Sequence, residues 1–136
     1  MGLENVRFER HDAAEPLPGP ADLVTCFDAI HDMARPTQVL ARIASALRVE
    51  GAFLMMDMAA SSRLEENLDH PIGTTLFAIS LFHCMTVSLA QGGDGLGTMW
   101  GEQRARAYLA EAGFSSLSVH HLEGDPMHVF YVGRVD

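Results

Sequence analysis

The stretch "ADLVTCFDAIHDMARPTQVLARIASALRVEGAFLMMDMAA", Ala21–Ala60, decides the fold. Its segments Asp22–Ala29 and Ala52–Ala59 are nearly continuous apolar runs, which is typical of strands buried on both faces. Between them, apolar residues recur at helical spacing from about Thr37, whose hydroxyl is a candidate N-cap, and Gly51 follows the predicted helix end. A helical crossover of this length joins parallel strands. The stretch therefore predicts a strand–helix–strand unit of an α/β sheet.

The flanking segments extend this pattern in both directions. Asn5–Ala13 alternates polar and apolar residues, which predicts a strand with one polar face. Ile72–Ala90 has no Asp, Glu, Lys or Arg and predicts a buried or lid helix in preference to a membrane span. Gly101–Gly113 predicts another helix. The strands "SSLSVHHLEG" and "MHVFYVGRV" flank a short "EGDP" turn, which predicts an antiparallel hairpin.

Composition limits the class of protein. A length of 136 residues suits one domain, and 48% hydrophobic with 20% charged residues is typical of a globular chain. The net charge of −9 argues against nucleic acid and against an anionic membrane surface as partners. Cys26 and Cys84 lie in apolar runs, which favours free buried thiols over a disulfide, and no cysteine spacing indicates a metal site. The N-terminal residues do not have the layout of a signal peptide, so we expect a cytoplasmic protein.

The order of elements resembles the class I S-adenosylmethionine (SAM)-dependent methyltransferases. "FDAIHD" resembles the motif after the fourth strand of that family, and "LRVEGAFLMMD" resembles the "L-x-P-G-G-x-L" approach to the fifth strand. "LAEAGF" resembles the helix end before the sixth strand, and "RFERHDAAE" the third strand with its aspartate. The resemblance implies a partial Rossmann-like α/β sheet, mostly parallel with an antiparallel C-terminal hairpin strand and helices on both faces. Residues 1–136 would form one domain, with a helical insert or lid at 72–113.

The resemblance covers only the C-terminal portion of the family fold. The family's first strand, glycine-rich cofactor loop and second strand would precede Asn5. In the family strand order 3-2-1-4-5-7-6, their absence bares one edge of the Asp22–Asp28 strand, and an unpaired edge is a template for another chain. Either the N-terminal strand pairs there or a second copy does. We expect a homodimer built on this edge or on the apolar 72–90 helix.

The resemblance also implies a cofactor site for SAM. Asp12, followed by Ala13, would accept a hydrogen bond from the adenine amino group, because an ionised carboxylate is a pure acceptor. Backbone groups of Phe27, Asp28 and Ala29 would line the pocket for the sulfonium. The alternative interpretations are a turn aspartate at Asp12 and an ordinary strand end at 27–29.

Other residues are candidates for the methyl-transfer step and for the substrate pocket. His31, with Asp32 beside it, is a candidate general base, although proximity and alignment alone can suffice for attack on a sulfonium. His83, Trp100 and Glu102 are candidates for a substrate pocket. The alternatives are a buried helix histidine at His83 and a helix-capping cluster at 100–102.

The sequence thus supports two functions. One is the C-terminal portion of a SAM-dependent methyltransferase that acts on an unidentified small molecule. The other is a non-catalytic, truncated methyltransferase-like fragment that acts as a dimerising scaffold, and the two differ in whether the chain binds SAM. A nicotinamide-dependent oxidoreductase fits less well, because its dinucleotide fingerprint is also missing and "FDAIHD" has no role in it.

Overall fold

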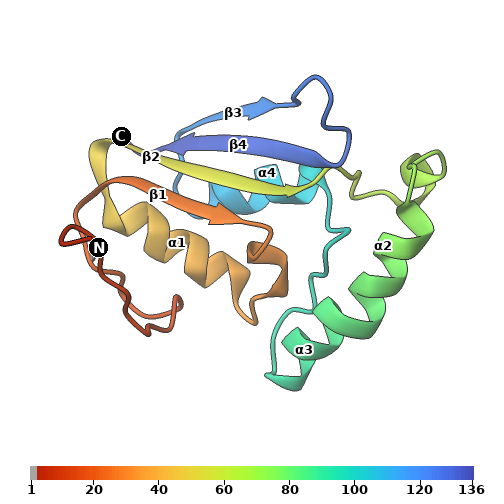
Figure 1. The fold of residues 1–136 in the computed structure, drawn as a ribbon, viewed down its shortest axis with the longest axis horizontal. Helices are drawn as coiled ribbons and strands as arrows, with labels where there is room; N and C mark the ends of the chain where they lie inside the picture. The colour runs from red at the N-terminus through yellow and green to blue at the C-terminus, as the bar shows by residue number, and fades with distance from the viewer. Residues whose placement is uncertain (1–2) are drawn as a thin grey trace.

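The computed structural model describes residues 3–136, which form one four-stranded sheet in the order β1-β2-β4-β3 (Figure 1). The strands are β1 (Ala21–Phe27), β2 (Leu47–Met58), β3 (Ser116–His120) and β4 (His128–Arg134). The predicted α/β class, with a partial Rossmann-like sheet and an antiparallel C-terminal hairpin, is confirmed. Parallel pairing is confined to β1 and β2, because β4 runs antiparallel to both of its neighbours, so the expected mostly parallel arrangement does not extend across these four strands.

Helix α1 (Pro36–Ala46) connects the two parallel strands, as predicted. It begins at Pro36 rather than at a Thr37 cap, since proline has the backbone angle of a first helical residue and no N–H to leave unpaired. It ends at Ala46, and β2 begins at the next residue, so Gly51 lies inside a strand and does not end the helix. A Cβ on Gly51 would lie 2.9 Å from the carbonyl oxygen of Ala21, so the close approach of β1 explains the glycine.

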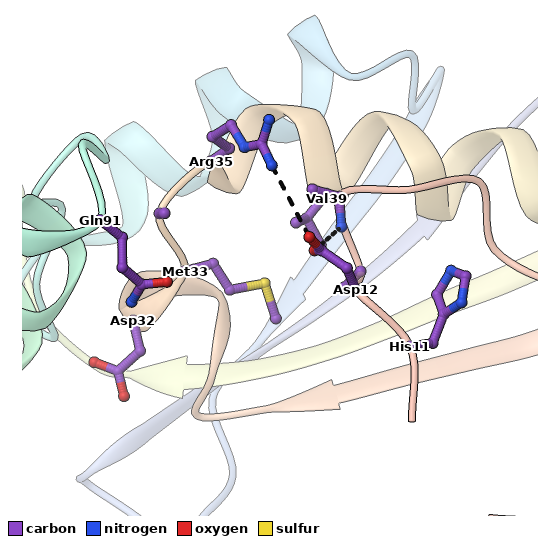
Figure 2. Close-up of a pocket in the computed structure, with 10 residues that line it drawn as sticks. His11, Asp12, Asp32, Met33, Arg35, Val39 and Gln91 are labelled. Atoms are coloured by element: carbon purple, nitrogen blue, oxygen red, sulfur yellow. Dashed lines mark hydrogen bonds and ion pairs between the residues drawn. The ribbon is translucent and has the colours of Figure 1, made fainter. Parts of the chain in front are cut away.

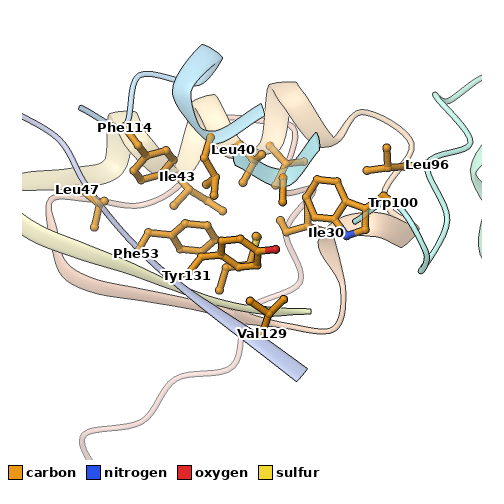
Figure 3. Close-up of a cluster of buried hydrophobic side chains, with 14 of the residues drawn as sticks. Ile30, Leu40, Ile43, Leu47, Phe53, Leu96, Trp100, Phe114, Val129 and Tyr131 are labelled. Atoms are coloured by element: carbon orange, nitrogen blue, oxygen red, sulfur yellow. The ribbon is translucent and has the colours of Figure 1, made fainter. Parts of the chain in front are cut away.

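The core lies between the sheet and two helices. Helix α4 (Glu102–Glu111) contacts α1 on the same face of the sheet (Figure 1). Phe53 of β2 and Tyr131 of β4 are at most 1% exposed, and the Phe53 ring stacks on that of Phe114 with centroids 5.5 Å apart (Figure 3). The predicted helix at Gly101–Gly113 and the predicted antiparallel hairpin are confirmed, although the hairpin loop covers residues 121–127 rather than a tight turn.

The opposite face of the sheet is open. Leu23 and Phe27 of β1 alternate with the core-facing residues and are 57% and 51% exposed. Both α1 and α4 cover the core face of the sheet. The expected arrangement, with helices on both faces, is therefore not present in the part of the chain that the structure describes.

The N-terminal segment does not form the predicted strand at Asn5–Ala13. It runs beside α1, where Gln38 Nε2 and Arg42 Nε donate hydrogen bonds of 2.8 and 3.2 Å to the Ala14 carbonyl, and Phe8 is 95% exposed. Alternating polarity alone does not make a strand when no neighbour offers backbone partners. The free edge of β1 therefore has no neighbouring strand within residues 3–136.

The apolar stretch forms one continuous helix at the side of the molecule (Figure 1). This side helix consists of α2 (Gly73–Ile79), a π-helical turn (Ser80–Cys84) and α3 (Met85–Ala90). By length and composition alone it could cross a membrane, and 28% of it is buried. Of the two expectations for this helix, the buried one is wrong, since Phe82 is 78% exposed and only a narrow side of the helix faces the body. The lid helix stays a prediction.

Candidate functional site

The carboxyl ends of β1 and β2 lie side by side. Phe27 pairs with Met56, and the backbone N–H of Asp28 donates a 2.8 Å hydrogen bond to the Met56 carbonyl. Asp28 has φ of 50°, a left-handed conformation that turns the chain into the short 3-10 helix η1 (Ile30–Asp32). The turn places the side chain of His31 over the end of β2. Open α/β sheets bind ligands beyond the carboxyl ends of their strands.

His31 and Asp57 form a buried pair at this position. The Nδ1 atom of His31 lies 2.9 and 3.1 Å from the two carboxylate oxygens of Asp57, and the residues are 3% and 1% exposed. The backbone N–H of Met58 also donates to Asp57, at 2.8 Å. Because an ionised carboxylate only accepts hydrogen bonds, Nδ1 carries the proton, and the lone pair of a neutral His31 is on Nε2.

Two further carboxylates face the same ring. Asp32 Oδ1 lies 3.5 Å from His31 Nε2, and Asp28 Oδ1 lies 3.9 Å from Nδ1. Burial lowers the pKa of His31, but the hydrogen bond and charge of Asp57, together with the charges of Asp32 and Asp28, outweigh it. The net result is a pKa above the ordinary 6.5. The environment therefore makes His31 a stronger base than a free histidine.

A pocket of about 280 Å³ lies between the N-terminal segment and the start of α1 (Figure 2). Asp32, the chain neighbour of His31, lines it, whereas His31 and Asp57 themselves do not. Asp12 and Arg35 line it, with Asp32 and Gln91 at one end and His11 at the other. Asp12 accepts a 2.9 Å hydrogen bond from the Ala14 N–H, and its second oxygen is 4.0 Å from Arg35 Nη2.

The structure brings some of the predicted cofactor residues together and separates others. Asp12 and Ala13 share the pocket with Asp32. Asp28 and Ala29 form the link from β1 to His31, whereas the side chain of Phe27 points to the open face.

The predicted substrate residues do not converge. Trp100 is 2% exposed and packs edge-on against Tyr108, with centroids 6.0 Å apart, so it is a core residue. Glu102 begins α4, pairs with Arg106 at 2.8 Å, and lines a second pocket of about 450 Å³ beside His70. His83 is exposed on the side helix, which overturns the expectation of a buried histidine there.

Sequence reasoning missed Asp57 and Cys84 as site residues. A signal for Asp57 was present, because an aspartate inside an apolar strand is rarely fully buried without a partner. No comparable signal exists for Cys84, whose thiol approaches Asp32 and His31 only through the tertiary fold.

Comparisons with known proteins agree with the fold. Residues 1–113 match a family profile that is described as "Methyltransferase domain". No match is found among curated protein sequences. A Nostoc punctiforme protein assigned as an O-methyltransferase is similar in structure, with 25% identity and a TM-score of 0.65 over 90% of this chain and 34% of its own.

Two further solved structures share the fold. Human N-acetylserotonin methyltransferase in complex with SAM is 20% identical, with a TM-score of 0.64 over 99% of this chain and 35% of its own. The trans-methyltransferase CalH in complex with SAH is 18% identical, with a TM-score of 0.69 over 98% of this chain and 37% of its own. The chain thus spans about a third of the length of these proteins. With its family profile and its β1-β2-β4-β3 sheet, it belongs to the class I methyltransferase-domain family and corresponds to a C-terminal portion of that fold.

Proposed function

We propose that this chain takes part in SAM-dependent methyl transfer to a small molecule and supplies the proton acceptor for that reaction. The observation that carries the proposal is the buried His31–Asp57 pair, held over the carboxyl ends of two parallel strands, with Asp32 connecting it to the wall of the 280 Å³ pocket. Asp57 orients the ring and favours its protonated form, so that Nε2 can accept a proton from a hydroxyl or amine as the methyl group is transferred.

Of the proposed cofactor contacts, Asp12 and Ala13 lie in the wall of the 280 Å³ pocket, and Phe27, Asp28 and Ala29 lie outside its lining. The Asp12 carboxylate would accept the adenine amino hydrogen bond next to Ala13, and backbone groups at Phe27, Asp28 and Ala29 would border the sulfonium. The hydrogen bond from the Ala14 N–H to Asp12 is the contact that the alternative interpretation, a turn aspartate, requires. It occupies one carboxylate oxygen and leaves the second, 4.0 Å from Arg35 Nη2, for the adenine amino group. An acceptor molecule would occupy the second pocket, which Glu102 lines and the buried Trp100 does not. The exposed position of His83 gives no support to a substrate contact.

A second candidate function, a dimerising scaffold without catalysis, is favoured by the free edge of β1. An unpaired strand flanked by the exposed side chains of Leu23 and Phe27 can pair with a second copy of the chain. This function requires self-association and no cofactor. A cytoplasmic location accompanies either function, and the two free thiols, Cys26 and Cys84, support it because the cytosol keeps thiols reduced.

Calorimetric titration with S-adenosylhomocysteine tests the two functions. Methyl transfer predicts micromolar binding by the wild-type chain that is weakened about tenfold or more in Asp12→Asn, as expected when one hydrogen bond to a charged group is lost. The matched control is Asp22→Asn, which removes an exposed carboxylate at the far end of β1 and should bind normally. Absence of heat, together with a dimer mass in light scattering, would favour the scaffold instead.

A further inference from the structure

A second set of donor atoms surrounds His31 on the side away from Asp57. His31 Nε2, one carboxylate oxygen of Asp32 and Cys84 Sγ all lie within 4.8 Å of one another. His31 and Cys84 are each 3% exposed. The three residues come from η1 and from the π-helical turn of the side helix, so the contact between these two segments creates the cluster.

We propose that His31, Asp32 and Cys84 bind a zinc ion through Nε2, a carboxylate oxygen and Sγ. Nitrogen, oxygen and sulfur are the ligand types that zinc takes in proteins, and three protein ligands leave a fourth tetrahedral position for water or a ligand atom. Magnesium and calcium, which prefer oxygen ligands alone, fit this set poorly.

The distances and the hydrogen bonding support zinc. Two ligands bound tetrahedrally to zinc at about 2.0–2.2 Å lie roughly 3.3–3.5 Å apart, and His31 Nε2 is 3.5 Å from Asp32 Oδ1. This contact is too long for a good hydrogen bond. The Asp32 side chain is 40% exposed, but its Oδ1 atom is buried and has no nitrogen or hydroxyl donor; the Cys84 thiol is the group that hydrogen-bonds to this carboxylate. A buried polar atom normally has a partner. A metal ion between the two atoms would satisfy both of them.

The surroundings of the cluster also match a metal site. A histidine that binds a metal usually donates its other ring N–H to a carboxylate, which fixes the orientation of the ring. Asp57 does this at 2.9 Å. Asp32 also lines the 280 Å³ pocket, so one of the three ligands faces that pocket (Figure 2).

Binding has a chemical consequence for Cys84 and His31. Burial, and then the neighbouring Asp32 carboxylate, raise the pKa of the Cys84 thiol to about 11. The thiol therefore holds its proton until the ion arrives, when the S–H bond breaks, the Sγ–zinc bond forms and the proton leaves to solvent. Because Nε2 cannot hold a metal and accept a proton together, zinc would switch off the base proposed above.

Titration with cobalt(II) as an optical probe tests the site without any measurement of methyl transfer, so the outcome is independent of the proposed function. Wild-type chain should give a thiolate-to-cobalt charge-transfer band that one equivalent of zinc abolishes. Cys84→Ser should lose the band, and Asp32→Asn should weaken binding at least tenfold. Asp57→Asn should keep the band with about 10–100-fold weaker affinity, the usual cost of a lost outer-shell carboxylate.

Two matched controls complete the experiment. Cys26→Ser removes the other free thiol and should bind normally. Asp28→Asn distinguishes the alternative cluster of Asp28, His31 and Asp57, which has no sulfur ligand. Folding of each variant is checked by circular dichroism, and zinc should raise the melting temperature of Cys26→Ser but not of Cys84→Ser. The proposal is overturned if wild type shows no charge-transfer band, if Cys26→Ser abolishes it, or if binding depends on Asp28 and not on Asp32.

Discussion

The two faces of the sheet use similar residues in different ways. On one face, Phe53 and Met55 of β2 are fully buried under α1 and α4. On the other face, Leu23 and Phe27 of β1 are more than half exposed, although the same apolar runs supply them. The core of this chain therefore needs only alternate residues of its strands. The remaining apolar side chains contribute little to the stability of the chain by itself and form a surface suited to contact with something else.

The largest expected effect separates the two faces directly. Phe53→Ala should reduce the free energy of unfolding by about 3–5 kcal/mol, because it leaves a cavity in a closed core. Phe27→Ala, the matched change on the open face, should change it by about 0.5 kcal/mol or less. Urea denaturation followed by circular dichroism measures both. A large, concentration-dependent loss in Phe27→Ala would show that a second copy covers the open face.

The buried polar pair is the next test, since it lies at the end of the covered face. Asp57→Asn should cost about 1–3 kcal/mol, because it removes the charge that holds the buried His31 ring. Asp28→Asn changes an exposed carboxylate 3.9 Å from the same ring and should cost far less. Equal losses in the two variants would mean that Asp57 has no special role.

The smallest effect is a dependence on pH. The pKa of His31 is raised in the folded chain, mainly by Asp57 acting against the effect of burial. A raised histidine pKa adds stability that is fully present below the unfolded value of about 6.5 and is lost as the pH rises through the folded value. The difference in unfolding free energy between wild type and His31→Gln should therefore be greatest in acid and shrink towards alkaline pH. A difference that grows with pH contradicts the prediction.

Local pattern predicted most of the fold. The apolar runs at β1 and β2, the helical spacing of α1 and α4 and the terminal hairpin are each encoded within about ten neighbouring residues. The failed predictions depended on partners instead. The segment at Asn5–Ala13 has the alternation of a strand but no neighbour to pair with, and Gly51 is required by the approach of Ala21, which no local pattern reveals.

The sequence predicts some residues of the candidate site but not the contacts between them. His31 and Asp32 are visible in the sequence as a titratable pair, and the family resemblance points to Asp12. The partnership of His31 with Asp57 depends on the register between β1 and β2, and that of Asp32 with Cys84 depends on how the side helix docks. Both are long-range contacts, so neither spacing nor composition predicts them.

The π-helical turn keeps one side of the side helix facing the body of the domain along its whole length. The buried residues of the side helix recur at every fourth position: Leu76, Ser80, Cys84 and Ser88. In a regular α-helix each four-residue step overshoots a full turn by about 40°, so Ser88 would be rotated roughly 120° from Leu76 and would face water. The wider turn at Ser80–Cys84 absorbs that drift and keeps all four against the body. Deleting one residue there would rotate the residues that follow, including Ser88, by about 100° around the helix axis. Their contacts with the body of the domain would then be lost.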